Sequence, residues 1–297
     1  MTATTRQVQA PLRRTFKWDQ FLSRFFLYTI LLILSLLFAM PFLWMLSSSL
    51  KDDRQTYAIP PIWIPRPARW QNYPEALTYL PFGKYFLNTM QIVIPVATGT
   101  VLSCTLVAYG FSRVEWSWRE PLFFICISTM MIPFQVRMIP LFITFKKLKW
   151  INTYKPLTVP AWFGGPYFIF LLRQFFLTVP RDLSDAALID GCSELRTLLA
   201  IFVPLARPAL ATVALFSTMW TWNDYLGPLI YVNKAEKYPL ALGLQHLRQA
   251  GAGVLEMKLI WPYLMAASTA TIVPIIVLYF FTQRTFIEGI TLTGVKG

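Results

Sequence analysis

The sequence has few charged residues, and acids are the scarcest of them. Only 14% of its 297 residues are charged, with 14 Asp and Glu against 27 Lys and Arg. A soluble domain carries roughly 25% charged residues. The length would suit one large or two ordinary soluble domains. Instead, a hydrophobic content of 56%, with 24 Phe and 11 Trp, predicts a bundle of helices embedded in a membrane.

Cysteine and histidine are also rare, which argues against metal chemistry. Cys104, Cys126 and Cys192 lie far apart and outside any metal-ligand spacing, and His246 is the one histidine. Neither a disulfide framework nor a zinc site is expected from this pattern. The sequence also lacks a GxxxxGK[ST] phosphate loop and a GxSxG nucleophile elbow. We therefore predict no catalytic residue, no bound metal and no enzymatic activity for this chain.

The formal charge of +13 is compatible with nucleic-acid binding or with the basic loops of a membrane protein. A nucleic-acid footprint gathers Lys and Arg on one face or stripe. Here the basic residues are scattered between apolar runs, which is typical of the loops that connect transmembrane helices. We therefore expect a lipid bilayer, and not nucleic acid, as the surroundings of this chain.

Six stretches are apolar enough to cross a bilayer, for which about 20 residues suffice. Three carry no charge: 25–50, 85–112 and 259–283. Three more contain or meet a charged residue: 121–145, 157–172 and 208–232. A charge near a helix end can reach the interface or face the bundle interior. The sequence thus predicts an all-α integral membrane protein with six transmembrane helices.

These stretches divide the chain. We expect a basic N-terminal arm at 1–24, a first transmembrane helix at 25–50, an external loop at 51–84 and a cytoplasmic tail at 284–297. Residues 85–283 form the core, with loops at 180–206 and 233–258. The first span is too long for a signal peptide and no small-residue cleavage site follows it. The arm favours a cytoplasmic N-terminus. Counted with the arm, and with Arg137 set aside as intramembrane, Lys and Arg number 13 on each side of the membrane, so charge alone leaves the orientation open.

The loop at 180–206 has the composition of two short helices joined at a glycine. Asp182 or Ser184 can cap the first helix and Gly191 can end it. Ser193 can cap a second helix, which Pro204 disturbs. Exposed apolar contacts are expected from Leu188, Ile189, Leu195 and Leu199. Physical arguments leave two readings equally open: a connector lying on lipid, or a docking element for a soluble partner.

The spacing of this loop resembles a known signature. It reads EAA, three residues, G, nine residues, I, one residue, then LP, and it marks the cytoplasmic loop of permeases in binding-protein-dependent ABC importers. This sequence departs from it twice, with Asp for Glu at 185 and Val for Leu at 203. The resemblance assigns ATPase docking to Asp185, Ala186, Ala187, Asp190, Gly191, Ile201, Val203 and Pro204.

Further segments extend the resemblance to nearly the whole chain. "FLWMLSSSLK", "YFLNT", "VAYGFSR", "WNDYLGPL" and the C-terminal "QRTFIEGITLTGVKG" are similar to the smaller permease of carbohydrate importers of the maltose type. The resemblance implies the type I ABC importer permease fold with six transmembrane helices in the plasma membrane of a prokaryote. Both termini are then cytoplasmic, and the basic "FKKLKW" segment lies outside, against the charge rule.

The same resemblance implies a function and a set of partners. The chain would move a sugar or sugar derivative inward beside a second, larger permease. Two copies of a cytoplasmic ATPase would bind ATP and Mg, so that this chain itself binds no cofactor. An extracytoplasmic sugar-binding protein would deliver the substrate and meet the loop at 233–258. Gly251 and Gly253 would give that loop flexibility, although a plain solvent loop is an equal alternative.

The sugar pathway has candidates in "TMWTWNDYLGPL", namely Trp220, Asn223 and Asp224. The alternative places Trp222 and Tyr225 in an interfacial aromatic belt, with Asp224 as a cap or a paired group. The resemblance also implies that the larger permease makes most sugar contacts. A rival function is a secondary transporter or channel acting without an ATPase. It would need intramembrane acids, of which Asp224 is almost the only one.

Overall fold

The computed structural model describes the backbone of residues 18–253 and 260–293, and the side chains of 22–249 and 260–283. Every regular element in these residues is a helix, which confirms the predicted all-α class. Three helices are long and apolar enough to cross a membrane: α1 (Trp18–Ser49), α4 (Phe82–Ser112) and α15 (Ile260–Thr293). They correspond to the three stretches without charged residues. Long apolar runs of this kind favour continuous helices.

Two of these helices are longer than predicted. α1 begins within the predicted basic arm, and α15 continues into the predicted tail as far as Thr293. Residues 1–17 of the arm and 294–297 of the tail lie outside the described residues. The apolar pattern marks the part of a helix that fits the bilayer, whereas helical hydrogen bonding continues beyond it.

The three remaining predicted spans are broken. α5 (Arg119–Ser128) and the 3-10 turn Thr129–Met131 meet α6 (Phe134–Lys147) at a bend of 99°. Pro133 causes it, because a residue before proline avoids helical geometry and Ile132 is extended. The 157–172 stretch divides into α7 (Lys155–Thr158), the turn Val159–Phe163 and α8 (Pro166–Thr178).

The 208–232 stretch likewise ends as two helices, α12 (Arg207–Trp222) and α13 (Leu226–Tyr231). α12 is bent by 81° from the helical segment 194–205 before it. By length and composition, the described residues therefore hold three helices able to cross a membrane, or up to five if each bent pair is one span. The predicted number of six is compatible with this arrangement.

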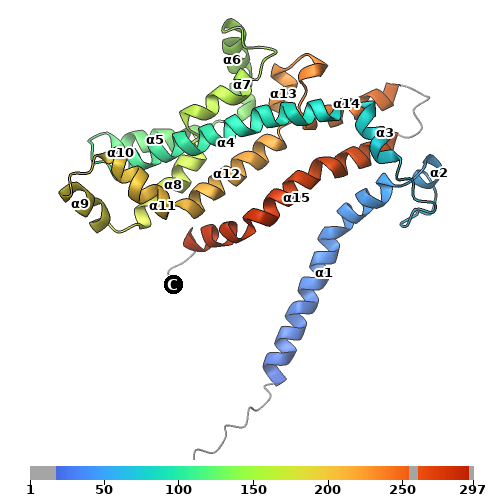
Figure 1. The fold of residues 1–297 in the computed structure, drawn as a ribbon, viewed down its shortest axis with the longest axis horizontal. Coiled ribbons are helices and arrows are strands. Elements are labelled where there is room, and N and C mark those ends of the chain that lie inside the picture. Colours follow the sequence, from blue (N-terminus) through green and yellow to red (C-terminus); the bar gives the residue numbers. More distant parts are fainter. Residues whose placement is uncertain (1–17, 254–259, 294–297) are drawn as a thin grey trace, which may run out of the picture.

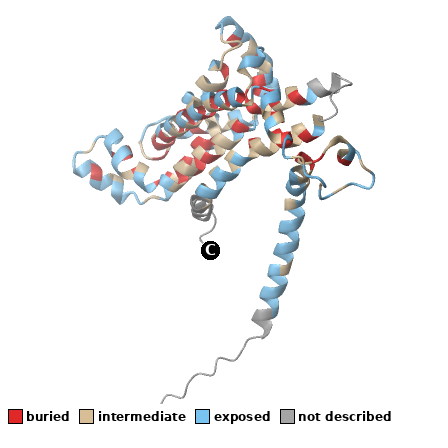
Figure 2. Ribbon diagram, turned by 45° about the vertical axis from the view of Figure 1, so that its right-hand side comes forward, coloured by how far each residue is buried: buried red, intermediate tan, exposed pale blue. Residues whose placement is uncertain are grey.

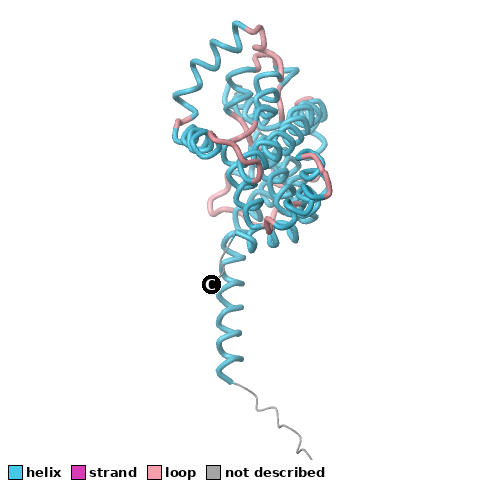
Figure 3. Tube along the Cα trace, turned by 90° about the vertical axis from the view of Figure 1, so that its left-hand side faces the viewer, coloured by secondary structure: helices cyan, strands magenta, loops and turns pink. Residues whose placement is uncertain are grey.

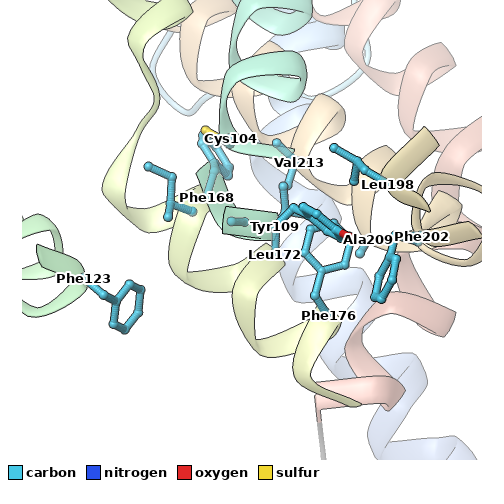
Figure 4. Packing of buried hydrophobic residues seen from close by; sticks show 13 residues of the cluster. Cys104, Tyr109, Phe123, Phe168, Leu172, Phe176, Leu198, Phe202, Ala209 and Val213 are labelled. Carbon is cyan, nitrogen blue, oxygen red and sulfur yellow. The ribbon is translucent and has the colours of Figure 1, made fainter. Parts of the chain in front are cut away.

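The centre of the molecule is a bundle in which α4 packs against α8 and α12 (Figure 1). Its buried cluster contains side chains from these helices and from the loop between α8 and α12, as Figure 4 shows. The members include Tyr109, Phe168, Leu172, Phe176, Leu198, Phe202 and Val213. The 180–206 loop therefore shares its core with the membrane bundle.

The predicted loop at 233–258 is mostly helical. After a short turn at Ala235–Lys237, α14 runs from Leu240 to Gly253, and residues 254–259 lie outside the described residues. α14 buries Leu240 and Leu247 against α4 and α15. A side chain at Gly243 would collide with the ring of Tyr85. Gly251 and Gly253 belong to this helix, so the prediction of a flexible loop around them was wrong.

α1 stands apart from the bundle, as Figure 3 shows. Its membrane-length segment buries nothing against the rest of the described chain, and its surface is almost entirely exposed in Figure 2. It is attached at its C-terminal end, where Asn72 Nδ2 donates to the carbonyls of Ser49 and Lys51 at 2.8 Å each. The ammonium of Lys51 lies 3.6 Å from the ring centroid of Trp44, and burial lowers the pKa of Lys51. α1 thus offers a long apolar surface to its surroundings.

The predicted external loop at 51–84 contains only short helices, as its prolines require. These are α2 (Asp53–Thr56) and α3 (Asn72–Tyr79). α3 is fixed to α15 by the Tyr263 hydroxyl, which donates to Glu75 Oε2 at 2.5 Å. The Tyr263 hydrogen bond, and then Arg69, hold the pKa of Glu75 below its usual value. A carboxylate with these two donors keeps the loop against α15.

Candidate functional site

The loop at 180–206 begins with α9 (Asp182–Ile189), whose C-cap is Asp190, and Gly191 directly follows the cap and stops the helix as the sequence predicts. Gly191 has a φ of +74°, a conformation that only glycine adopts without strain. Its N–H donates to the carbonyl of Leu188 at 3.0 Å, and the N–H of Cys192 donates to Ala187 at 2.9 Å. This pair of bonds is a Schellman motif. It fixes the direction of the chain leaving α9.

The start of α9 differs from the prediction. Its N-cap is Arg181, with no side-chain cap, and neither Asp182 nor Ser184 accepts a capping bond. Ser193 does cap the next helix as predicted, because its hydroxyl accepts from the N–H of Arg196 at 3.4 Å. The two helices thus meet at a fixed glycine turn and a serine cap.

The second helix of the loop contains one wide turn. α10 (Glu194–Thr197) leads into a π-helical segment, Leu198–Phe202, and then α11 (Val203–Leu205). The N–H of Val203 donates to the carbonyl of Leu198. Pro204 has no N–H to continue the normal ladder, and a π turn is one way in which a helix accommodates such a break. Val203 and Pro204 therefore lie where the helix widens and then bends into α12.

The loop exposes four large apolar side chains. Ile189 is 86% exposed and Leu188 55% exposed. Leu195 and Leu199 are also exposed on the second helix. We call these four side chains the apolar crest. Ala187, expected on the surface, is instead buried, so the small face of α9 turns toward the bundle while Asp185, Ala186 and Asp190 remain exposed.

One hydrogen bond joins the loop to α4. The Tyr109 hydroxyl donates to Glu194 Oε2 at 2.7 Å. The Tyr109 ring is buried between Phe202, 5.2 Å away between ring centroids, and Phe176, 6.3 Å away (Figure 4). A bond between a fixed phenol and a carboxylate is charge-assisted and stronger than a neutral one. This bond ties α10 to the C-terminal end of α4.

Arg113 strengthens the same junction. Its guanidinium donates to the carbonyls of Phe176 and Val179 at the end of α8, and it lies 4.9 Å from the Phe202 ring. Burial lowers the pKa of Arg113. The sequence interpretation missed Tyr109, Arg113 and Glu194. The segment "VAYGFSR", which contains Tyr109 and Arg113, indicates only the family resemblance when it is considered as sequence.

A cavity of about 390 Å³ lies behind α9. It is lined by Tyr109, Arg113, Glu194, Arg181 and Asp185, among others, and also by Leu188 of the apolar crest. Arg181 approaches Glu115 at 3.7 Å, but both side chains are mostly exposed, so this pair contributes little. α9 is thus held by its connections and by Ala187, with open space behind its charged side.

The three candidate sugar-path residues make different contacts. Trp220 packs its ring near Phe168 and Tyr167, at 5.0 and 5.3 Å between centroids, and is 54% exposed. Asn223 donates to the carbonyl of Met219 in its own helix at 2.8 Å. Asp224 Oδ1 accepts from the N–H of Gly227 at 3.0 Å, so this carboxylate caps α13.

Trp222 lies in the core and not in the interfacial aromatic belt in which the alternative interpretation placed it. Trp222 is buried and packs against Phe86 at 6.1 Å between ring centroids. Trp220 therefore provides an exposed aromatic surface on α12, whereas Trp222 belongs to the core. Within the described residues, no group of three or more His, Cys, Asp or Glu side chains is placed to hold a metal ion.

Comparison with known proteins places this chain among transport permeases. Residues 99–291 match the family described as binding-protein-dependent transport system inner membrane component. The arabinooligosaccharides transport system permease protein AraQ of Halalkalibacterium halodurans is 35% identical over 73% of this chain and 75% of its own length. The diacetylchitobiose uptake system permease protein NgcG of Streptomyces coelicolor is 31% identical over 86% of this chain and 84% of its own.

A solved structure shares the fold. One chain from the crystal structure of a bacterial ABC transporter involved in the import of the acidic polysaccharide alginate superposes with a TM-score of 0.78. The match covers 92% of this chain and 99% of that chain, at 22% sequence identity. The predicted type I importer permease fold is thereby confirmed.

Membrane-length helices and a helical loop whose core is shared with α4 and α8 agree with a transport permease. The family match extends over more than half of the sequence. The chain therefore belongs to the family of binding-protein-dependent transport system inner membrane components. The resemblance seen in the sequence is confirmed at the level of this family.

Proposed function

We propose that this chain is a non-catalytic transmembrane subunit of an ATP-driven importer and that its 180–206 loop docks a cytoplasmic ATPase. The apolar crest carries the proposal. Four exposed apolar side chains lie on two helices whose relative direction is fixed by Gly191 and Ser193. An exposed apolar patch on a rigid support is typical of a protein-binding surface. The docking surface would also include the neighbouring polar and small residues of α9 and its turn: Asp185, Ala186, Asp190 and Gly191.

The way the loop enters the core supports a mechanical role. Leu198 and Phe202 are buried in the cluster shared with α4 and α8, and Tyr109 joins α4 to Glu194. When ATP closes the partner ATPases, α9 to α11 move together with the ends of these helices. The loop then acts as a two-state element biased by ATP at one end and by the loaded binding protein at the other.

The proposed orientation places α9 and both termini in the cytoplasm of a prokaryote, with the chain in its plasma membrane. The partners are a larger permease, two ATPase subunits and an extracytoplasmic binding protein. ATP and Mg belong to the ATPases, and this chain binds no cofactor. The exposed surface of α1 is covered by lipid and by the second permease.

We further propose that the cargo is a sugar or sugar derivative. The relatives named above carry out import of arabinooligosaccharides and diacetylchitobiose according to their names. The exposed ring of Trp220 offers a flat aromatic surface of the kind on which the CH face of a sugar stacks. Asn223 and Asp224 are weaker candidates, because their side chains bond to the local backbone.

The rival function, a secondary transporter or channel without an ATPase, would use an intramembrane acid for ion or proton coupling. Asp224 is the acid that the sequence offers for this role. Its Oδ1 caps α13 through the Gly227 N–H, and this structural use favours the importer over the rival.

Docking is tested by co-purification of the cognate ATPase with Ile189→Asp. Burying an isoleucine contributes roughly 1.5–3 kcal/mol, and an aspartate adds a desolvation cost. We expect at least a tenfold loss of ATPase association with normal membrane insertion. Ile189→Leu, which keeps the apolar surface, is the matched control. Full association of the aspartate variant would contradict the docking assignment.

The sugar pathway is tested with Trp220→Ala in the reconstituted importer. We expect substrate-stimulated ATP hydrolysis to fall severalfold while ATPase association remains normal, because Trp220 lies far along α12 from the loop. Asn223→Ala should have a smaller effect. If Trp220→Ala leaves both stimulation and transport unchanged, Trp220 is a packing residue.

A further inference from the structure

Two segments distant in sequence are joined at one asparagine, on the side of the molecule where α6, α7 and α13 gather (Figure 1). The N–H of Asn152 donates to the carbonyl of Tyr231 at 2.7 Å. Its Oδ1 accepts from the N–H groups of Asn233 and Lys234, at 3.3 and 3.2 Å. Lys237 Nζ donates to the Asn152 carbonyl at 2.7 Å. Residues 145–155 and 231–237 therefore form one surface.

This surface has a packed aromatic base. Phe145 lies 5.4 Å from Tyr231 and 5.6 Å from Trp150 between ring centroids. Phe145 and Tyr231 are buried. The turn that follows α6 has left-handed backbone at Lys149 (φ 57°) and Asn152 (φ 63°). Such a turn persists where the surrounding contacts determine it, so the surface is preorganised.

Lysines cover its outer side. Residues 145–155 and 231–237 contain a single acid, Glu236, and the following lysines: Lys146, Lys147, Lys149, Lys155, Lys234 and Lys237. We call these six residues the lysine ledge. Within the described residues, no carboxylate lies within 4.0 Å of any of them, since every ion pair found there uses an arginine. The six lysines therefore form no ion pair within the described residues, and Glu236 is the one acid of these two segments.

The ledge also has an apolar centre and an adjoining cavity. Leu148, between Lys147 and Lys149, is 51% exposed. A cavity of about 370 Å³ in the same region is lined by Lys84, Asn88, Tyr154, Glu236 and Lys237, among others. An apolar centre with a charged rim is the usual composition of a protein interface.

We infer that the lysine ledge docks an acidic surface of the extracytoplasmic binding protein. This inference rests on the proposed function, whose orientation puts the ledge outside. Lys and Arg are usually enriched in the cytoplasmic loops of membrane proteins. A lysine cluster on the outer side departs from this rule, which suggests that it has a function there. Attraction of an acidic partner supplies one, because complementary charges accelerate encounter and fix orientation.

The structure favours a protein over a lipid surface as the occupant. A lipid-binding helix lays a long apolar face into the bilayer, whereas Phe145 and Tyr231 are buried inside this chain. The lysines also come from three separate segments: the end of α6, the start of α7 and the turn before α14. A fixed arrangement across several segments fits one shaped partner.

The test uses the complete importer reconstituted in nanodiscs with its loaded binding protein. The variant is Lys146→Glu/Lys147→Glu/Lys149→Glu, and the control is Lys146→Arg/Lys147→Arg/Lys149→Arg, which keeps the charge. Stimulated ATP hydrolysis is measured against binding-protein concentration at low and high salt. We expect the glutamate variant to need about tenfold more binding protein at low salt, with convergence at high salt. Its rate at saturation and the control should match wild type.

Each other outcome is decisive. An unchanged concentration and salt dependence in the glutamate variant would overturn the inference. An effect that follows anionic lipid content in the absence of binding protein would assign the ledge to lipid instead. An effect present with acidic but not neutral cargo would assign it to the substrate. Absence of ATPase association in wild type would instead refute the proposed function.

Discussion

At the scale of single residues, Gly191 determines how the loop leaves α9. Its φ of +74° allows the Schellman bonds to Leu188 and Ala187. An added Cβ would meet nothing within 4 Å. A substitution of Gly191 by alanine therefore acts through backbone strain and not through a steric clash of the new side chain.

We predict that Gly191→Ala weakens ATPase association and transport severalfold. Left-handed backbone costs a non-glycine residue roughly 1–2 kcal/mol, which favours another direction of the loop. Gly110→Ala is the matched control, because Gly110 lies within α4, has ordinary helical φ and also has open space at its Cβ. Co-purification and uptake assays distinguish the two. Equal behaviour of both variants would show that the turn geometry is unimportant.

At the scale of elements, the middle of the chain departs most from the prediction. The apolar runs of α1, α4 and α15 are long and uninterrupted, so hydropathy alone located them. The 121–145 run bends at Pro133, because the residue before a proline avoids helical geometry, and the 208–232 run is divided between α12 and α13. The 157–172 run is likewise divided, between α7, a 3-10 turn and α8. Hydropathy measures burial in the bilayer and does not register such bends.

The local turns of the candidate site were predictable from the sequence, whereas its long-range contacts were not. The turn at Gly191 and the cap at Ser193 depend on neighbouring residues, and local sequence specifies them. The bond between Tyr109 and Glu194 joins residues 85 positions apart, and only packing of α4 against the loop brings them together. The inward turn of Ala187 depends on the same packing.

That bond gives a prediction about coupling between α4 and the loop. We expect Tyr109→Phe and Glu194→Gln each to reduce transport per ATP hydrolysed, because a charge-assisted bond of roughly 1.5–3 kcal/mol is lost or weakened. The double variant should be no worse than the worse single variant, as in a pair that acts together. The ratio of uptake to hydrolysis in proteoliposomes is the measurement.

Glu115→Gln is the matched control for this pair. Glu115 lies at the same junction, but its contact with Arg181 is 3.7 Å long and exposed. Its removal should leave coupling unchanged. Additive losses from Tyr109→Phe and Glu194→Gln would indicate that the two residues act separately and that the hydrogen bond does not transmit movement.

At the scale of the whole molecule, the two functional surfaces lie on different parts of the fold. The apolar crest is at the α9 tip, and the lysine ledge is where α6 and α13 gather (Figure 1). α4 contacts the loop through Tyr109 and the other surface through Asn88, whose Nδ2 donates to the carbonyls of Glu236 and Tyr238 at 2.9 and 3.0 Å. One continuous helix thus touches both regions.

The central claim is that the α9 tip contacts the ATPase in the assembled importer. The most direct measurement places a photo-crosslinking amino acid at position 189 and, as a control, at position 38 on the exposed surface of α1. In a transport-competent complex we predict a light-dependent adduct between position 189 and the ATPase subunit, and none from position 38. An active complex with no ATPase adduct at position 189 would contradict the account.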